Sequence, residues 1–101
     1  MASRLDLQNK LEELSGHKNV YYQPPESIKM EYQAIRYSKK SIQSIFANDA
    51  RYSGMTCYEV IVIDRLPDSE TVSKILNLPY CRFDRHYVAD NLHHDVFTLY
   101  Y

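Results

Sequence analysis

Apolar residues recur with a helical period near the start of the chain. Leu7, Leu11 and Leu14 are spaced at i, i+4 and i+7, which places them on one face of a helix. Gly16 follows, and glycine is a common residue just beyond a helix C-terminus. The pattern therefore predicts an amphipathic helix over residues 4–15.

Two short β-prone segments come next, and a polar stretch follows them. The first covers residues 19–22 and is stopped by two prolines, and the second covers roughly residues 30–37. Residues 38–51 are polar apart from three apolar side chains, Ile42, Ile45 and Phe46. Their spacing allows a helical turn, and a long functional loop between two strands is the alternative.

The clearest strand in the sequence covers residues 57–64. Its residues 60–63 form a continuous branched-aliphatic run, which is typical of a strand that is buried on both faces. We therefore expect this strand to lie in the centre of a sheet.

A second helix is expected after the central strand. Asp68 or Ser69 is its N-terminal cap, and Pro79 ends the segment. The apolar residues between them have helical spacing: Val72, Ile75 and Leu76.

Residues 80–101 have the pattern of one β-hairpin. Asp90 and Asn91 suit a two-residue turn, because both tolerate positive φ better than most residues. That turn sets His86 opposite Asp95.

The two faces of this hairpin differ in composition. One face carries Cys81, Phe83, Tyr87, Ala89, Leu92, Val96 and Tyr100. The other mixes charged and apolar side chains, and its apolar members are Val88, Phe97, Leu99 and Tyr101. A two-layer domain needs one apolar sheet face, and mixed aromatic and charged faces are typical of protein contacts. We therefore predict that the second face is a surface for self-association.

Together these segments predict an α+β fold. The expected order is α-β-β-β-α-β-β in a single two-layer domain over residues 1–101. Its sheet is mixed or antiparallel, with two helices on one face.

Composition and charge exclude several classes of protein. The chain has 101 residues, 45% of them apolar and 25% charged, as in ordinary globular domains. A formal net charge of -1 without a basic stripe argues against a dedicated nucleic-acid binder. No stretch approaches the roughly 20 apolar residues of a membrane span, and the first residues lack the apolar run of a secretory signal. We therefore expect a protein that folds in the cytosol.

A short basic run at residues 36–40 is the best candidate for contact with nucleic acid. It contains Lys39 and Lys40 beside one tyrosine. Such a run is more often a solvated strand end. In a ring of several copies, however, the two lysines would line a channel through which DNA passes.

Histidines and carboxylates crowd the hairpin: Asp84, His86, His93, His94 and Asp95. On the expected register His86, His93 and Asp95 share a face, and His94 points to the other. No HxH or HExxH spacing is present, so a polar solvated face is the favoured interpretation and a zinc or iron site is the alternative.

Other reactive groups have sufficient structural explanations. Cys57 and Cys81 lack CxxC partners and do not lie at a helix N-terminus, so we expect two reduced thiols. Asp64, Asp68 and Glu70 surround the start of the second helix, where acids cap the helix and favour its dipole. We predict no enzyme activity, no catalytic residues, and no cofactor or metal.

Three segments resemble small neck proteins of long-tailed bacteriophages (siphophages). They are VYYQPPESIKMEYQAIRYS at residues 20–38, YEVIVIDRLPDSE at 58–70 and LPYCRFDRHYVADNLHHDVFTLYY at 78–101. The likeness is greatest to the tail-terminator, or tail-completion, group from phages of Gram-positive bacteria, and it covers nearly the whole chain. One departure is Gln33, where a proline is expected before Ala34.

The resemblance implies a structural virion protein that forms a hexameric ring at the phage neck. Such a ring caps the tail tube and joins the tail to the head-completion proteins, and DNA passes through its lumen. The implied partners are other copies of the chain, the head-completion or stopper protein, the major tail tube protein and the tape-measure protein. DNA is only a passing neighbour, no membrane is involved, and the ring assembles in the host cytoplasm.

The resemblance places contact regions only loosely. Residues 38–53 are the candidate to reach a neighbouring subunit or the tube, with Ile42, Ile45 and Phe46 as apolar anchors. Packing of these three side chains under their own loop is the alternative.

Three other functions stay open. One is a stopper or adaptor of the same neck, although β-barrel or helical folds are expected for those. Another is a small enzyme or metal-binding domain that uses His86, His93 and Asp95. The third is a free-standing regulatory domain, such as an inhibitor of a host protein.

Overall fold

The computed structural model describes residues 4–16, 19–23, 32–47, 50–67 and 69–101, and only the backbone within residues 41–55. Along these residues lie two helices and five strands, in the order expected from the sequence. The helices are α1 (Arg4–Ser15) and α2 (Glu70–Leu76). The strands are β1 (Val20–Tyr22), β2 (Ala34–Ala47), β3 (Ala50–Asp64), β4 (Cys81–Ala89) and β5 (Leu92–Tyr100).

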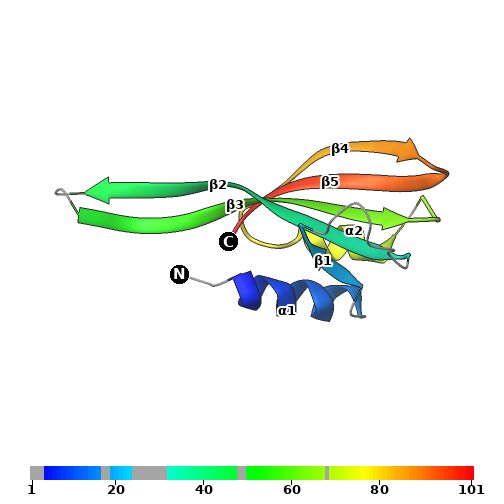
Figure 1. Cartoon of the computed structure of the whole chain (residues 1–101), viewed down its shortest axis with the longest axis horizontal. Helices are drawn as coiled ribbons and strands as arrows, with labels where there is room; N and C mark the ends of the chain where they lie inside the picture. The colour runs from blue at the N-terminus through cyan, green and yellow to red at the C-terminus, as the bar shows by residue number, and fades with distance from the viewer. Residues whose placement is uncertain (1–3, 17–18, 24–31, 48–49, 68) are drawn as a thin grey trace.

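The strands form one mixed sheet in the order β1-β2-β3-β5-β4. β1 pairs with β2 in parallel, and the other neighbouring strands are antiparallel. Both helices lie on the same side of this sheet (Figure 1). The prediction of an α+β fold with two helices on one face is therefore confirmed.

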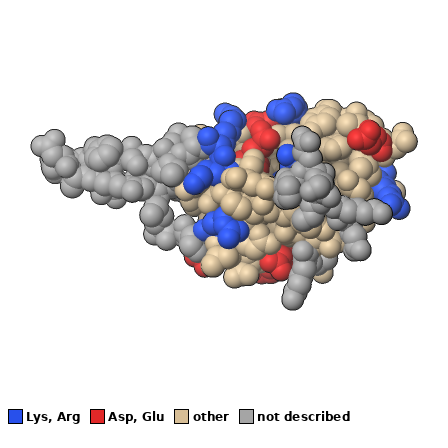
Figure 2. All heavy atoms as spheres, in the orientation of Figure 1, with Lys and Arg blue, Asp and Glu red and all other residues tan. Residues whose placement is uncertain are grey.

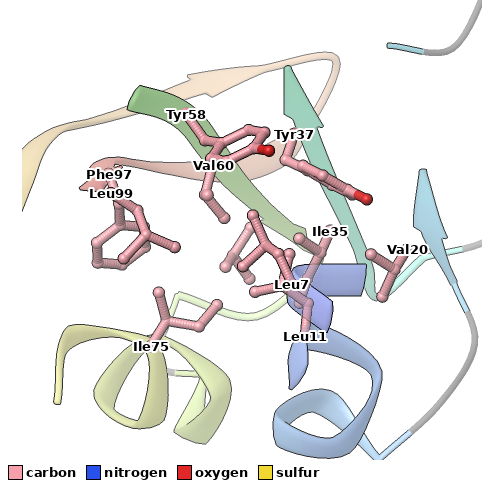
Figure 3. Close-up of a cluster of buried hydrophobic side chains, with 11 residues drawn as sticks. Leu7, Leu11, Val20, Ile35, Tyr37, Tyr58, Val60, Ile75, Phe97 and Leu99 are labelled. Atoms are coloured by element: carbon pink, nitrogen blue, oxygen red, sulfur yellow. The ribbon is translucent and has the colours of Figure 1, made fainter. Parts of the chain in front are cut away.

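The main hydrophobic core lies between the helices and the sheet (Figure 3). Leu7 and Leu11 enter it from α1 and Ile75 enters it from α2, and all three are fully buried. The strands contribute Val20, Ile35, Tyr37, Tyr58, Val60, Val62, Phe97 and Leu99. The spacing of Leu7 and Leu11 in the sequence predicted that both are buried, because a surface helix buries one stripe of side chains.

The part of β3 in the body of the sheet is buried on both faces, as its aliphatic run indicated. Val60 and Val62 belong to the core under the helices. Ile61 and Ile63 lie in a second cluster with Val96 and are only 8% and 3% exposed. The helices cover one face of β3, and on the other face side chains of β5 (Val96 and Leu92) pack beside Ile61 and Ile63.

The described residues of the stretch 38–51, which are 38–47 and 50–51, are strand residues, so the prediction of a helical turn or a loop is wrong. β2 and β3 continue through it as an antiparallel ribbon, from Ile42 opposite Thr56 to Ala47 opposite Ala50. The ribbon extends beyond the other strands (Figure 1). Strands are recognised in a sequence by alternating apolar and polar residues, and this alternation arises where one face of a strand is buried in a core. The ribbon extends beyond the core, so the pattern did not predict its strands.

β4 and β5 form the predicted hairpin around Asp90 and Asn91, whose φ angles are 54° and 62°. The predicted pairing holds from this turn as far as Arg85 opposite Val96. A bulge at Asp84 then shifts the register by one residue.

The bulge moves two residues to the other face of the hairpin. Phe83 pairs with Phe97 and Cys81 pairs with Leu99, so both lie on the face that carries the core. The prediction that Cys81 and Phe83 share a face with Val96 is wrong, because a shift of one residue exchanges the two faces of a strand.

Candidate functional site

The first candidate contact surface is the outer part of the β2–β3 ribbon, residues 42–47 and 50–55, which we call the arm. Within the described chain, the backbone of the arm pairs only with itself. The pairing of β1 with β2 reaches only to Tyr37, and the pairing of β5 with β3 begins at Cys57. The predicted anchors Ile42, Ile45 and Phe46 lie on the arm, outside the side chains that the structure describes.

Lys39 and Lys40 lie where the arm joins the body, and both are exposed. The backbone N–H of Lys39 donates a hydrogen bond to Gln23 Oε1 at 3.2 Å. A hydrogen bond from Thr98 lowers the pKa of Asp84, and nearby positive charges, including that of Lys40, lower it further. Figure 2 shows several Lys and Arg side chains at this end of the body.

Two predicted contact residues of the hairpin lie in the core instead of on a surface. Phe97 and Leu99 are fully buried, because the helices cover this face of the sheet. The prediction that they form an exposed contact face is therefore wrong for the single chain. Tyr101 packs partly buried against the same core, and Val88 is 57% exposed.

Sequence reasoning named Val88 but missed the other large apolar residues that are exposed on or beside β4, the edge strand of the sheet. They are Leu76, Tyr80, Phe83 and Tyr87, with Tyr87 on the face opposite Phe83. A groove of about 530 Å³ runs between α2 and the hairpin, and Val72, Leu76, Phe83 and Asp95 are among its lining residues. Charged residues interspersed along a strand are typical of a sheet edge, and they were the signal in the sequence that could have located this surface.

His86, His93 and Asp95, which we call the histidine cluster, lie on the face of the hairpin that carries Phe97. His86 Nδ1 is 2.7 Å from Asp95 Oδ1, and His93 Nδ1 is 3.3 Å from His86 Nε2. His94 lies on the other face, where its ring stacks on Tyr87 at a centroid distance of 4.6 Å. The predicted division of these residues between two faces is confirmed. Among the described residues, no group of three or more His, Cys, Asp or Glu side chains is placed to hold a metal ion.

The two cysteines are free thiols, and Cys81 is not activated as a nucleophile. Cys57 is buried and Cys81 is partly buried. Burial raises the pKa of Cys81, and the Asp84 carboxylate raises it further. A raised pKa leaves little thiolate at neutral pH, and the thiolate is the reactive form.

Asp64 takes part in a structural network at the start of α2. It accepts hydrogen bonds from Gln33 Nε2 at 3.0 Å and from a backbone N–H two residues on at 3.1 Å. Thr71 Oγ1 donates to Gln33 Oε1 at 3.3 Å. Ser69 is the N-cap residue, but its hydroxyl contacts Gln33 and makes no capping hydrogen bond. Asp68 lies outside the described residues.

Comparisons with known protein families, with curated proteins and with solved structures found no match. None of the described helices is long and apolar enough to cross a membrane. The arm, the β4 edge and the histidine cluster are therefore the features of the described chain from which a function is argued.

Proposed function

We propose that the chain is a structural protein of the neck of a long-tailed bacteriophage. Copies of it form a ring, six-fold by the resemblance, that caps the tail tube and joins the tail to the head-completion proteins. The likeness of residues 20–38, 58–70 and 78–101 to tail-terminator proteins supports this assignment. In this role the protein organises an assembly and catalyses no reaction.

The arm is the observation that carries the proposal. It is paired along its length, from Ile42 opposite Thr56 to Ala47 opposite Ala50, yet no other strand of the described chain supports it. A two-stranded ribbon by itself is marginally stable in water. A second subunit that packs against the arm would supply the missing contacts, and neighbours in a ring are placed to do so.

The edges of the sheet offer further contact area. β1 and β4 are the outer strands, and an exposed strand edge pairs readily with another chain. On β4, Tyr87 is 38% exposed and Val88 is 57% exposed, so apolar surface accompanies this edge. Head-to-tail contacts between unlike surfaces close into a ring when the rotation between subunits allows it.

The proposed neighbours are other copies of the chain, the head-completion or stopper protein, the major tail tube protein and the tape-measure protein. DNA passes through the lumen, where Lys39 and Lys40 would contact phosphates without reading sequence. The ring is assembled in the host cytoplasm and becomes part of the virion.

The runner-up is a stopper or adaptor of the same neck. β-barrel or helical folds are expected for those proteins. The five-stranded mixed sheet with two helices favours the terminator role over them.

The number of copies in purified phage particles tests the proposal. Mass spectrometry of particles from the host should find this chain at about half the copy number of the portal protein, which corresponds to one six-fold ring beside a twelve-fold portal. A far larger number would indicate a tube subunit. Absence from mature particles would overturn the virion role.

A further inference from the structure

Two histidines on neighbouring strands hold their ring nitrogens close together near the tip of the β4–β5 hairpin. His86 lies opposite Asp95, and His93 lies two residues before Asp95 on the same face of β5. His86 Nε2 and His93 Nδ1 are 3.3 Å apart. Both rings are partly open to solvent, so an ion has access to them.

Asp95 determines which nitrogen of His86 is available. Its side chain is 12% exposed, and its Oδ1 lies 2.7 Å from His86 Nδ1. An ionised carboxylate only accepts hydrogen bonds, so the His86 tautomer that pairs with it is the one with its proton on Nδ1. The lone pair of the neutral ring is then on Nε2, which is the nitrogen that faces His93.

We propose that His86 Nε2 and His93 Nδ1 bind one Zn²⁺ ion. Tetrahedral zinc with bonds of about 2.0–2.1 Å to imidazole places two such nitrogens roughly 3.3 Å apart, the separation present here. The ion takes the place of the proton between the two nitrogens, and His93 adopts the tautomer with its proton on Nε2. Imidazole ligands select zinc and similar transition metals over magnesium and calcium.

The surroundings of the two nitrogens fit this assignment. A carboxylate that accepts the other N–H of a zinc-binding histidine fixes the ring and strengthens it as a ligand. Asp95 has this relation to His86. Since the described residues include no group of three or more His, Cys, Asp or Glu placed to hold a metal ion, water or a group from another chain completes the coordination.

Calorimetric titration of the purified full chain with Zn²⁺ tests the site, with Mg²⁺ as the control metal. The wild type should bind one Zn²⁺ per chain and no Mg²⁺. His93→Gln should weaken zinc binding by about tenfold or more, because a single imidazole is left as ligand. The matched control is His94→Gln, next in the chain but on the other face, stacked on Tyr87, and it should bind zinc as the wild type does.

Asp95→Asn tests the supporting role of the carboxylate. Loss of such a partner typically costs about 10–100-fold in metal affinity, and we expect a loss in that range. Circular dichroism verifies that each variant is folded. Unchanged zinc binding in His93→Gln, equal losses in His93→Gln and His94→Gln, or no saturable binding by the wild type would each overturn the site. The proposed neck function does not depend on any of these outcomes.

Discussion

Asp84 determines which side chains of β4 reach the core. It is the extra residue of the bulge, so Phe83 pairs with Phe97 and faces the helices. Its carboxylate accepts a hydrogen bond from Thr98 Oγ1 at 2.5 Å and lies 3.4 Å from Arg82 Nε. Thr98 and Arg82 thus hold the side chain of Asp84 at the bulge, and the register shift at this bulge brings Phe83 into contact with Phe97 in the core.

Substituting Thr98 with valine should make the protein less sensitive to acid. The hydrogen bond from Thr98 is the largest of the effects that lower the pKa of Asp84. A carboxyl group with a lowered pKa in the folded state stabilises the fold above its unfolded pKa, and this contribution is lost as the pH falls through the folded pKa. The wild type should therefore lose stability below about pH 4, and Thr98→Val should lose less over the same range.

Urea unfolding at pH 7 and at pH 3 measures this difference. At pH 7 the valine variant should be less stable than the wild type by about 1 kcal/mol, because a partly exposed charged hydrogen bond is removed. Thr98→Ser retains the hydroxyl and serves as the control, with a pH dependence like that of the wild type. An identical loss of stability in the valine variant and the wild type would show that the hydrogen bond does not shift the titration of Asp84.

Phe97 and Val88 distinguish core from surface on the same face of the hairpin. Phe97 is fully buried and packs edge-on against Phe83 at a centroid distance of 5.5 Å, whereas Val88 is 57% exposed. Phe97→Ala should therefore cost about 3–5 kcal/mol of unfolding free energy. Val88→Ala should change it by less than about 0.5 kcal/mol. Denaturant unfolding of both variants measures the contrast, and a mild effect at Phe97 would mean that this face is not the core.

The inner and outer parts of β3 differ in how many neighbouring strands they pair with. Its residues 57–64 lie between β2 and β5 and are mostly buried, whereas its residues 50–55 pair only with β2. The inner part is held by hydrophobic burial and by hydrogen bonds on both edges. The outer part has backbone pairing on one side only, so its stability depends on what contacts the arm.

Replacing residues 43–55 with Asn-Gly should preserve folding and prevent assembly. Ile42 and Thr56 face each other, so a two-residue turn with positive φ joins them without a change of register. The backbone of the arm extends beyond the other described strands and pairs with none of them, so the thermal unfolding midpoint should change little (Figure 1). Circular dichroism measures folding, and electron microscopy of particles from a complemented phage measures tail completion. Normal tails made with this variant would show that the arm has no part in assembly.

The whole molecule is elongated, and the arm contributes to its length. It measures 51 × 27 × 23 Å, and the ribbon lies along the long direction (Figure 1). The net charge is only -1, yet basic side chains gather where the arm meets the body (Figure 2). In the proposed ring, this arrangement lets the arm reach a neighbour while the base of the arm faces the DNA.

Reversing the charge of Lys39 and Lys40 together should impair DNA passage and leave folding unchanged. Both residues are exposed, and surface substitutions of this kind usually alter stability by less than about 0.5 kcal/mol each. Lys74→Glu on the exposed side of α2 is the control for a change in net charge. Infectivity and DNA ejection are measured for phage that carry each variant. Full ejection by the Lys39→Glu/Lys40→Glu phage would exclude these lysines from the lumen.

The pattern of residues was sufficient for elements whose signals are local. The leucine spacing identified α1, the aliphatic run identified the central part of β3, and Asp90 with Asn91 identified the hairpin turn. Each of these signals lies within a few neighbouring residues. Burial of one stripe of a helix, burial of both faces of a strand and a positive φ each leave a mark on the residues that adopt them.

Other features depend on contacts between residues that are distant in the chain. The register shift at Asp84, the self-pairing of the arm and the parallel pairing of β1 with β2 have no periodic signal, because periodicity does not say which strands become neighbours. The 3.3 Å separation of His86 Nε2 and His93 Nδ1 also has no periodic signal in the sequence. The predicted turn and register placed both histidines on one face of the hairpin, and the tertiary structure set the distance that brings their nitrogens within reach of a single ion.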